Sequence, residues 1–479
     1  MEKTAHTAIL GAGITGLCVA HSLRTASLDA PASYHLIESS DQVGGALQST
    51  QDMGYLAEHG PNSILIKDQR VAQMLDDIGL GDDPSRNQLH ESLDAREEAK
   101  KRYIVQDGQP HAMPSSLIGM LRTPLFSTRG KLRFGLEPFI GKYKGREQGK
   151  GEESFADFVR RRLGPDMLAS AAGPFVSGIY AGNPENLSVR HAFPRLWNLE
   201  HHYGSFILGA LALQWGGGKN PHRLAPSRML SFRSGMHAMP SAIAKHLPKD
   251  SLKLQCQVSS IEPIHKNGKT GWSLSWTDAS GNLQTGHYRQ LVIAVPHHQL
   301  PSLPLPTSVL NALDPITQLH APPVTSMVLG FKRDDITHPL DGFGMLIKQT
   351  ENSPLLGVLF SSSMFDGRAP DGHVTLTCMM GGSIHPEYAK NDEQVVLDEL
   401  NRLLGVTGSP TFRHRTTWNH AIPQYGLDYQ NVLDALESCE SHHPGLHFAG
   451  NYRGGISVGD CIVNGLELGR SLTSTENGA

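Results

Sequence analysis

Three glycines and one acid near the start of the chain have the types and spacing of a dinucleotide site. Gly11, Gly13 and Gly16 form a G-x-G-x-x-G motif, and Glu38 ends the next predicted strand. The first glycine permits a tight turn, the second lets the backbone approach a pyrophosphate, and the third lets a helix pack closely on a strand. The helix that begins with Ile14 and Thr15 would hold the phosphates at its N-terminus, and Glu38 would accept hydrogen bonds from ribose hydroxyls.

Further glycines favour FAD over NAD as this dinucleotide. The pair Gly44 and Gly45 follows soon after the acid, and "GYLAEHGPNS" at 54–63 comes next. A second glycine pair suits a cofactor whose isoalloxazine ring extends beyond the first turn, although an ordinary loop is the alternative. No second G-x-G-x-x-G exists for NAD(P)H, so dioxygen is the expected electron acceptor. In the later segment we expect Gly60, Pro61 and Asn62 to contact the cofactor.

The end of the chain repeats the strand–turn–helix pattern in "FAGNYRGGISVGDC" at 448–461. A helix that begins near Val458 would direct its positive end at the flavin ring and favour its reduction. Packing of this helix on the sheet alone is the alternative. The candidate cofactor contacts here are Gly450, Asn451, Ser457 and Val458, and the backbone of Val258 is a candidate contact of the adenine.

The elements that must position these residues predict an α/β fold. We expect a Rossmann-like FAD-binding domain with an inserted mixed-sheet substrate domain and a mostly helical subdomain. The FAD-binding domain is assembled from 1–90, 226–300 and 411–479. The helical subdomain, with part of the substrate site, covers 91–225, and the substrate-binding sheet covers 301–410.

Composition excludes several classes of function. A net charge of -4 argues against nucleic acid as a partner. Five scattered cysteines predict buried thiols in a reducing compartment, and no motif predicts a metal site. No apolar run reaches the ~18 residues of a membrane-spanning helix, and the first strand begins too early for a targeting segment.

Residues 113–146 interleave apolar side chains with arginines and lysines, as in a segment that lies at a lipid interface. We expect a cytoplasmic protein that contacts the inner face of the cell membrane through this segment. A subdomain face that packs on the core, with its lysines in solvent, is the alternative.

Several longer motifs resemble the oxygen-dependent protoporphyrinogen oxidase family, a branch of the FAD-dependent amine oxidases and phytoene desaturases. They are "PFVSGIYAGNPENLSVRHAFPRLW" (174–197), "SFRSGMHAMPSAI" (231–243), "GFGMLI", "LFSSSMFDGRAPDG" (360–372), "AIPQYGL" (421–427) and "FAGNYRGGISVGDC" (448–461). The resemblance covers about residues 5–472. It implies a stepwise six-electron oxidation of a porphyrinogen, with hydride transfer to the flavin and reoxidation by dioxygen to give hydrogen peroxide. It also implies membrane attachment and a homodimer.

The resemblance supplies substrate-binding residues rather than a catalytic side chain. Arg102 would pair with a substrate propionate, and Leu346 and Leu359 would enclose pyrrole rings. Met379 stands where plant-type members have a phenylalanine, so aromatic stacking is lost there. Gly178, in "PFVSGIYAG", completes this set. An ion pair of Arg102 with the nearby acids is the alternative for that residue.

Three other functions stay open at this point. A coproporphyrinogen III oxidase that makes coproporphyrin III is the nearest rival. An amine oxidase is more distant, because no aromatic pair is evident that could enclose an amine. A non-catalytic module of the same fold that binds prenylated proteins could dispense with the C-terminal turn, which is intact here.

Overall fold

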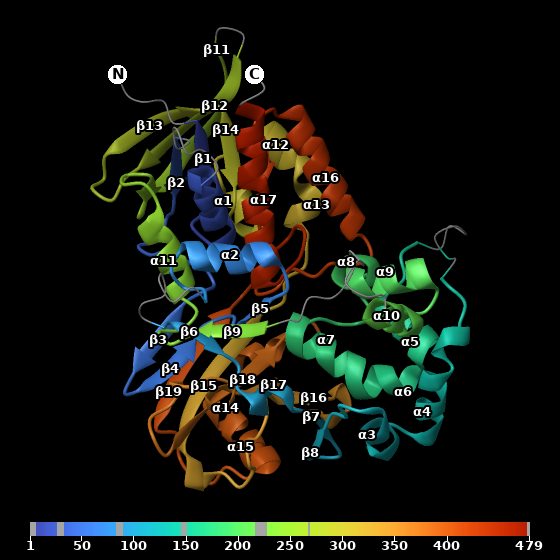
Figure 1. The fold of residues 1–479 in the computed structure, drawn as a ribbon. Helices are drawn as coiled ribbons and strands as arrows, with labels where there is room; N and C mark the ends of the chain where they lie inside the picture. The colour runs from blue at the N-terminus through green and yellow to red at the C-terminus, as the bar shows by residue number, and fades with distance from the viewer. Residues whose placement is uncertain are drawn as a thin grey trace.

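The computed structural model describes residues 6–25, 33–82, 90–143, 145, 151–215, 228–266 and 269–476. Figure 1 shows three groups of elements: a parallel sheet with its helices at the top, a second sheet below it, and a set of helices to the right. The predicted α/β fold with a mixed-sheet insertion and a helical subdomain is therefore confirmed. The predicted boundary between 225 and 226 lies outside the described residues, as do Lys144 and Arg146 of the basic segment.

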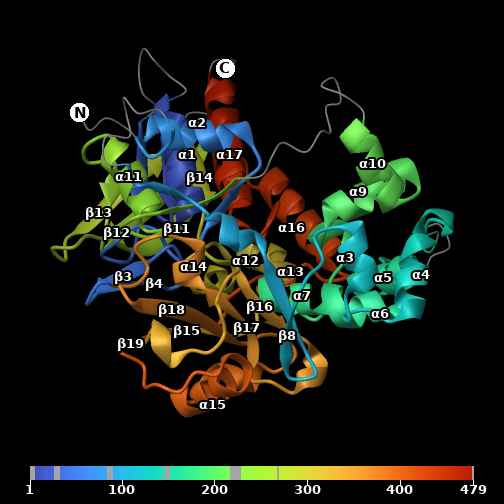
Figure 2. The same ribbon diagram turned by 60° about the horizontal axis from the view of Figure 1, so that its bottom comes forward.

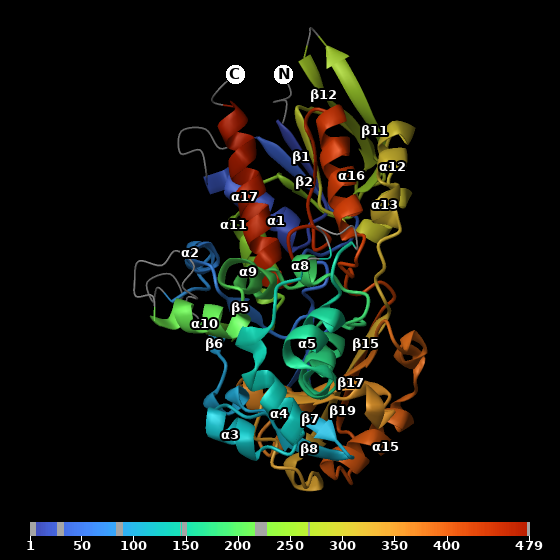
Figure 3. The same ribbon diagram turned by 90° about the vertical axis from the view of Figure 1, so that its right-hand side faces the viewer.

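The upper sheet is parallel, with the strand order β10-β2-β1-β14-β20. Strands from the beginning, the middle and the end of the chain thus lie side by side. Helices α1 and α17 pack together on this sheet in all three ribbon views (Figures 1, 2 and 3). The principal elements are β1 (Thr7–Leu10), α1 (Ile14–Thr25), β2 (Tyr34–Ile37), α11 (Ala238–His246), β10 (Leu252–Lys253), β14 (Gln290–Ile293), α16 (Tyr429–His442), β20 (Leu446–Phe448) and α17 (Val458–Glu476).

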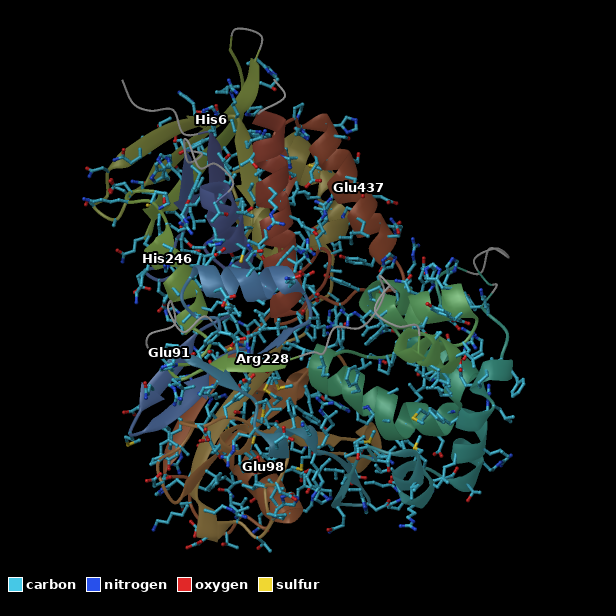
Figure 4. The ribbon with its side chains drawn as sticks, in the orientation of Figure 1. His6, Glu91, Glu98, Arg228, His246 and Glu437 are labelled. Atoms are coloured by element: carbon cyan, nitrogen blue, oxygen red, sulfur yellow. The ribbon has the colours of Figure 1, made fainter. Side chains whose placement is uncertain are left out.

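Smaller elements complete this part of the molecule. The antiparallel sheet β11-β12-β13 lies beside the parallel sheet, and the hairpin β3-β4 lies beside the lower sheet in Figure 1. The sheet β5-β9-β6 lies between the upper and lower sheets. Figure 4 labels Arg228 in this region, where its guanidinium pairs with Asp82 and Asp94. The bounds are β3 (Ser49–Asp52), β4 (Tyr55–Glu58), β5 (Ile64–Ile66), α2 (Gln69–Asp77), β6 (Ser92–Asp94), β9 (Arg228–Phe232), β11 (Gln257–Lys266), β12 (Lys269–Thr277) and β13 (Leu283–Tyr288).

The lower sheet has seven strands in the order β19-β15-β18-β17-β16-β7-β8. Helix α15 covers its outer face, where alternate side chains of the central strands form a hydrophobic core with the helix (Figure 2). The bounds are β7 (Arg102–Gln106), β8 (Gln109–Ala112), β15 (Val324–Lys332), β16 (Gly344–Ile347), β17 (Leu355–Phe360), α14 (Ser361–Met364), β18 (His373–Gly381), α15 (Glu393–Leu404) and β19 (Phe412–Trp418).

This arrangement differs from the predicted segment boundaries at three places. Strands β7 and β8 belong to the lower sheet, although the helical subdomain was predicted over 91–225. Strand β19 pairs with β15, so the lower sheet extends past residue 410. Helices α12 (Thr307–Ala312) and α13 (Asp314–Thr317) pack in one core with β14, β20 and α16, because the parallel sheet needs apolar cover on this face.

The helical group holds α3 (Leu117–Arg122), α4 (Thr128–Gly135), α5 (Phe155–Leu163), α6 (Pro165–Met167), α7 (Gly173–Tyr180), α8 (Val189–Ala192), α9 (Pro194–Tyr203) and α10 (Phe206–Trp215). The buried Arg162 of α5 joins its parts, because its guanidinium pairs with both Glu137 and Glu200. The oxygen of Ser154 accepts the N–H of Asp157 at 3.0 Å and caps α5. None of the described helices is long and apolar enough to cross a membrane.

Candidate cofactor and substrate site

The first glycine turn has the geometry that a dinucleotide site requires. Gly11 has φ +101°, and a Cβ on Gly16 would lie 2.0 Å from the Gly11 carbonyl oxygen. A Cβ on Gly13 would meet no protein atom within 4 Å, which leaves open space beside the start of α1. Ile14 and Thr15 form the first turn of this helix, whose N–H groups have no acceptor within the helix. Glu38 accepts the N–H of Ala12 at 2.7 Å and thereby faces the turn.

The second glycine pair lies directly against the first turn. Gly13 and Gly44 form a parallel bridge, and the N–H of Gly44 donates to the Ala12 carbonyl at 2.8 Å. A Cβ on Gly45, which has φ +58°, would contact only the Cα of Gly13, at 3.4 Å. Two backbone segments without side chains therefore face the same space, as a bound pyrophosphate would need.

The C-terminal glycine turn lies at the same edge of the parallel sheet as the first turn. All five strands point the same way, so Gly11 after β1 and Gly450 after β20 are at carboxyl ends that share one edge. Burial raises the pKa of Tyr425 well above its usual value, so this phenol stays neutral. Its hydroxyl donates to the Asn451 carbonyl at 2.7 Å and accepts the N–H of Gly455 at 3.1 Å, which fixes the loop.

Helix α17 begins at Val458, as the sequence predicts, with a reciprocal cap. The Ser457 hydroxyl donates to the Asp460 carboxylate at 2.6 Å and accepts the Asp460 N–H at 3.1 Å. Two glycines of α17 allow close packing on α1. A Cβ on Gly465 would lie 2.6 Å from the Thr15 carbonyl oxygen, and a Cβ on Gly469 would lie 2.8 Å from the Val19 carbonyl oxygen. The first and last helices are therefore held together beside the glycine turns.

The other predicted cofactor residues lie close to residues already described, since a Cβ on Gly60 would lie 2.6 Å from the carbonyl oxygen of Ala46, which follows Gly45. Gly60, Pro61 and Asn62 follow β4 and are half-buried. Val258 is in β11, two residues beyond Cys256, whose N–H donates to the Glu38 carbonyl at 2.9 Å. The structure thus brings the candidate adenine contact close to the candidate ribose contact.

The inner face of the lower sheet carries three predicted substrate residues in one area. Leu346 on β16 pairs with Gly357 on β17, and Gly357 pairs with Met379 on β18. Leu359 follows two residues after Gly357, so its side chain lies on the same face. Leu346, Leu359 and Met379 are each half-buried, whereas their sequence neighbours on the outer face are buried against α15. These three side chains form an apolar wall, which we call the inner wall.

Gly178 and Arg102 lie at the border of the inner wall. A Cβ on Gly178, in α7, would lie 2.2 Å from a methyl group of Leu346. Arg102 is exposed, opposite Gly344 in the next strand, and its guanidinium stacks 5.3 Å from the ring centre of Phe343. The nearby acids pair with other cations, as Asp341 does with Lys101 at 2.6 Å. No ion pair of Arg102 with a described residue is present, which leaves its charge available.

Sequence reasoning missed several residues that shape this site. Gly357 allows close packing between Leu346 and Met379, because a Cβ there would lie 2.6 Å from the Met345 carbonyl oxygen and 3.3 Å from a methyl group of Leu346. A glycine inside an apolar strand is a signal that could have indicated it. Phe343 supports Arg102, and Tyr425 holds the C-terminal turn, although both lie within motifs of the family resemblance.

Comparisons with known proteins agree with this architecture. The family described as flavin containing amine oxidoreductase matches residues 14–468. The chain belongs to this family. Protoporphyrinogen oxidase 2 of Arabidopsis thaliana is 34% identical over 96% of this chain and 92% of its own length. The coproporphyrinogen III oxidase of Bacillus subtilis is 25% identical over 96% of both chains. A crystal structure from Exiguobacterium, provisionally named as a protoporphyrinogen oxidase, has a TM-score of 0.78 at 20% identity and covers 99% of this chain and 100% of its own.

Membership of the flavin-containing amine oxidoreductases confirms the predicted resemblance, the flavoprotein class and FAD as the cofactor. The residues at the edge of the parallel sheet fit this group. They provide open space beside Gly13, a carboxylate at Glu38 and two helix N-termini at α1 and α17. The protein is therefore an FAD-dependent oxidoreductase.

Proposed function

We propose that this enzyme oxidises protoporphyrinogen IX to protoporphyrin IX in porphyrin and haem biosynthesis, with dioxygen as the acceptor and hydrogen peroxide as the product. The observation that carries this proposal is the 34% identity, along 96% of the chain, to an Arabidopsis protein named protoporphyrinogen oxidase. When bound, FAD accepts a hydride from a carbon of the substrate.

The inner wall supports a flat, apolar substrate. Leu346, Leu359 and Met379 would pack against the pyrrole rings of a macrocycle. Gly178 would keep α7 close to Leu346 at the border of the site. By excluding water, the inner wall would let the substrate carbon lie directly against the cofactor, with no ordered water between them.

Arg102 is the proposed partner of a substrate propionate. Its guanidinium is exposed and is supported from one side by the ring of Phe343. A carboxylate can accept two parallel N–H bonds from such a fork, which orients the macrocycle as well as binding it. We assign no catalytic acid or base, because hydride transfer from an activated carbon depends on orientation.

A coproporphyrinogen III oxidase is the second candidate, and the similarity to the Bacillus subtilis enzyme favours it. The test is aerobic turnover of the purified, yellow protein with protoporphyrinogen IX and coproporphyrinogen III in parallel. Porphyrin fluorescence and peroxide are measured together. Faster turnover of protoporphyrinogen IX supports the first assignment, and the reverse preference assigns the second. A flavin-loaded protein that oxidises neither substrate refutes both.

The surface of α3, α4 and the turn that follows supports the proposed contact with lipid. This surface, which we call the α3–α4 surface, exposes Ile118 (64%), Leu121 (70%), Leu132 (67%), Leu136 (45%) and Phe139 (84%). Arg122 and Arg129 are exposed beside these side chains. Apolar side chains rimmed by cations suit the boundary of an anionic bilayer. In Figure 3 this region lies at the lower edge of the helical group.

Sedimentation with vesicles that contain anionic lipid tests this contact. We expect Phe139→Glu to bind several-fold less than the wild type, because a charge would replace the most exposed ring. Leu283→Glu is the matched control, since Leu283 is 70% exposed on β13, far from this surface. Equal binding of both variants would exclude the α3–α4 surface.

A cytoplasmic location on the inner face of the cell membrane and a homodimer complete the proposal, and light scattering of the purified protein tests the dimer.

A further inference from the structure

A buried ion pair joins the upper and lower parts of the molecule. Glu58 ends β4, and Arg368 lies in the loop between α14 and β18. A guanidinium nitrogen of Arg368 lies 3.8 Å from an oxygen of Glu58, and each side chain is 2% exposed. Two buried charges in a segment that joins two sheets are costly unless their partners are well defined.

Arg368 also connects to the candidate cofactor loop through a serine. Its guanidinium donates to the Ser231 hydroxyl at 2.6 Å and to the Phe232 carbonyl at 3.2 Å. The Ser231 hydroxyl in turn donates to the carbonyl of Asn62 at 3.2 Å. A chain of hydrogen bonds therefore runs from the lower sheet through β9 to the segment Gly60–Asn62.

Glu58 holds a second loop of the upper part. Its carboxylate accepts the N–H of Met236 at 3.0 Å and the Ser49 hydroxyl at 2.5 Å. A Cβ on Gly235, which has φ +88°, would lie 2.3 Å from the Ser49 oxygen, so this turn fits tightly over the carboxylate. Burial raises the pKa of Glu58 to about 7, and the hydrogen bonds and the charge of Arg368 oppose that rise.

The backbone of Arg368 strengthens the same connection. Its carbonyl accepts the N–H of Leu56 in β4 at 3.2 Å and the Thr375 hydroxyl in β18 at 2.7 Å. Arg368 thus contacts β4, which leads into Gly60–Asn62, and it also contacts β9 and the inner face of the lower sheet at β18. The positions of these three strands relative to one another therefore depend on Arg368.

We infer that Glu58 and Arg368 are positioning residues that set the Gly60–Asn62 segment, and with it the bound flavin, relative to the inner wall. This inference rests on the proposed cofactor contacts of that segment. It predicts that disturbing the pair changes the environment of the flavin before it changes substrate binding.

Arg368→Lys is the first test, because lysine keeps the charge but cannot reach Glu58, Ser231 and Phe232 with one rigid fork. We expect a shifted visible absorption band of the bound flavin and release of FAD about tenfold faster than in the wild type. With porphyrinogen, we expect kcat to fall about tenfold while KM stays within about twofold, since misplacement by less than 1 Å can cost such a factor. Arg413→Lys, in the exposed pair with Glu393, is the control.

Ser231→Ala is the second test, because it removes one oxygen and leaves both charges in place. It should shift the flavin band in the same direction by a smaller amount. An unchanged flavin band and unchanged FAD release in both variants would overturn the inference, as would a KM increase without any change in kcat. If Arg368→Lys fails to fold, the flavin band of Ser231→Ala decides. The spectrum and FAD release use no porphyrinogen, so their outcome is separate from that of the proposed function.

Discussion

Alanine at Gly13 and alanine at Gly16 should affect this enzyme in different ways, although the two glycines belong to one motif. A Cβ at Gly13 meets no protein atom within 4 Å, so the folded apoprotein accommodates it. A Cβ at Gly16 would lie 2.0 Å from the Gly11 carbonyl oxygen and 3.3 Å from the Ala294 Cβ. The 2.0 Å distance to the Gly11 carbonyl oxygen is more than 1 Å too short for a Cβ contact, so the backbone must move to relieve it.

The expected magnitudes follow from these distances. Overpacking at Gly16 should cost about 1–3 kcal/mol of the free energy of unfolding. At Gly13 the apoprotein should change by less than about 0.5 kcal/mol, as at a surface position. The methyl group would instead occupy space that the cofactor phosphates need. A similar steric cost of about 1–3 kcal/mol, applied to binding, lowers FAD affinity by roughly 5- to 150-fold.

Thermal melts of the apoproteins, with and without added FAD, measure both quantities. The wild type and Gly13→Ala should melt together without FAD, and added FAD should raise the melting temperature of the wild type much more. Gly16→Ala should melt lower in both conditions. If purified Gly13→Ala retains one flavin per chain and gains the full stabilisation by FAD, the phosphates do not lie against Gly13, and our account of the turn is wrong.

Three further changes test other parts of the site and of the core. Arg102→Ala should raise KM for the porphyrinogen about 10- to 100-fold with unchanged flavin content, as for a lost charged hydrogen bond; saturation kinetics with an unchanged KM would remove Arg102 from the site. Gly178→Ala should displace the flexible end of Leu346 and raise KM about 5-fold or more with little change in melting temperature; equal kinetics in both proteins would contradict this. Burial lowers the pKa of His297 to about 4, below the ordinary 6.5, so its contribution to stability is present above pH 6.5 and is lost as the pH falls towards 4. The wild type should therefore lose about 3 kcal/mol more of its free energy of unfolding than His297→Gln between pH 7 and pH 4 in urea titrations, and parallel curves would exclude this role.

Local patterns of the chain were sufficient to predict several elements and their roles. The glycine spacing at Gly11–Gly16 predicts a tight strand-to-helix turn because the closest contact of a Cβ at Gly16 is with the nearby Gly11 carbonyl oxygen. The start of α17 at Val458 was predictable from local sequence as well, since a helix cap involves residues three apart. The five buried free thiols also agree with prediction.

Segment boundaries and the surroundings of individual side chains were harder to predict from the sequence, because they depend on residues far along the chain. Strand β18 alternates apolar and polar side chains, which indicates two faces, but the pattern does not say what covers each one. The structure places Cys378 against α15 and Met379 on the inner wall. The addition of β19 to the lower sheet is likewise decided by the exposed edge of β15, which no local pattern reveals.

By itself, the sequence determined the dinucleotide turn, the family and the flavin, because these depend on short-range backbone geometry and on motifs that stay contiguous in the chain. Only the tertiary structure decided that the first and last glycine turns share one sheet edge, that Leu346 and Met379 lie on either side of Gly357, and that Arg368 reaches Glu58 and Ser231. These relations join residues that are distant in the sequence. Folding creates them, because apolar faces need cover and buried charges need partners within the folded chain.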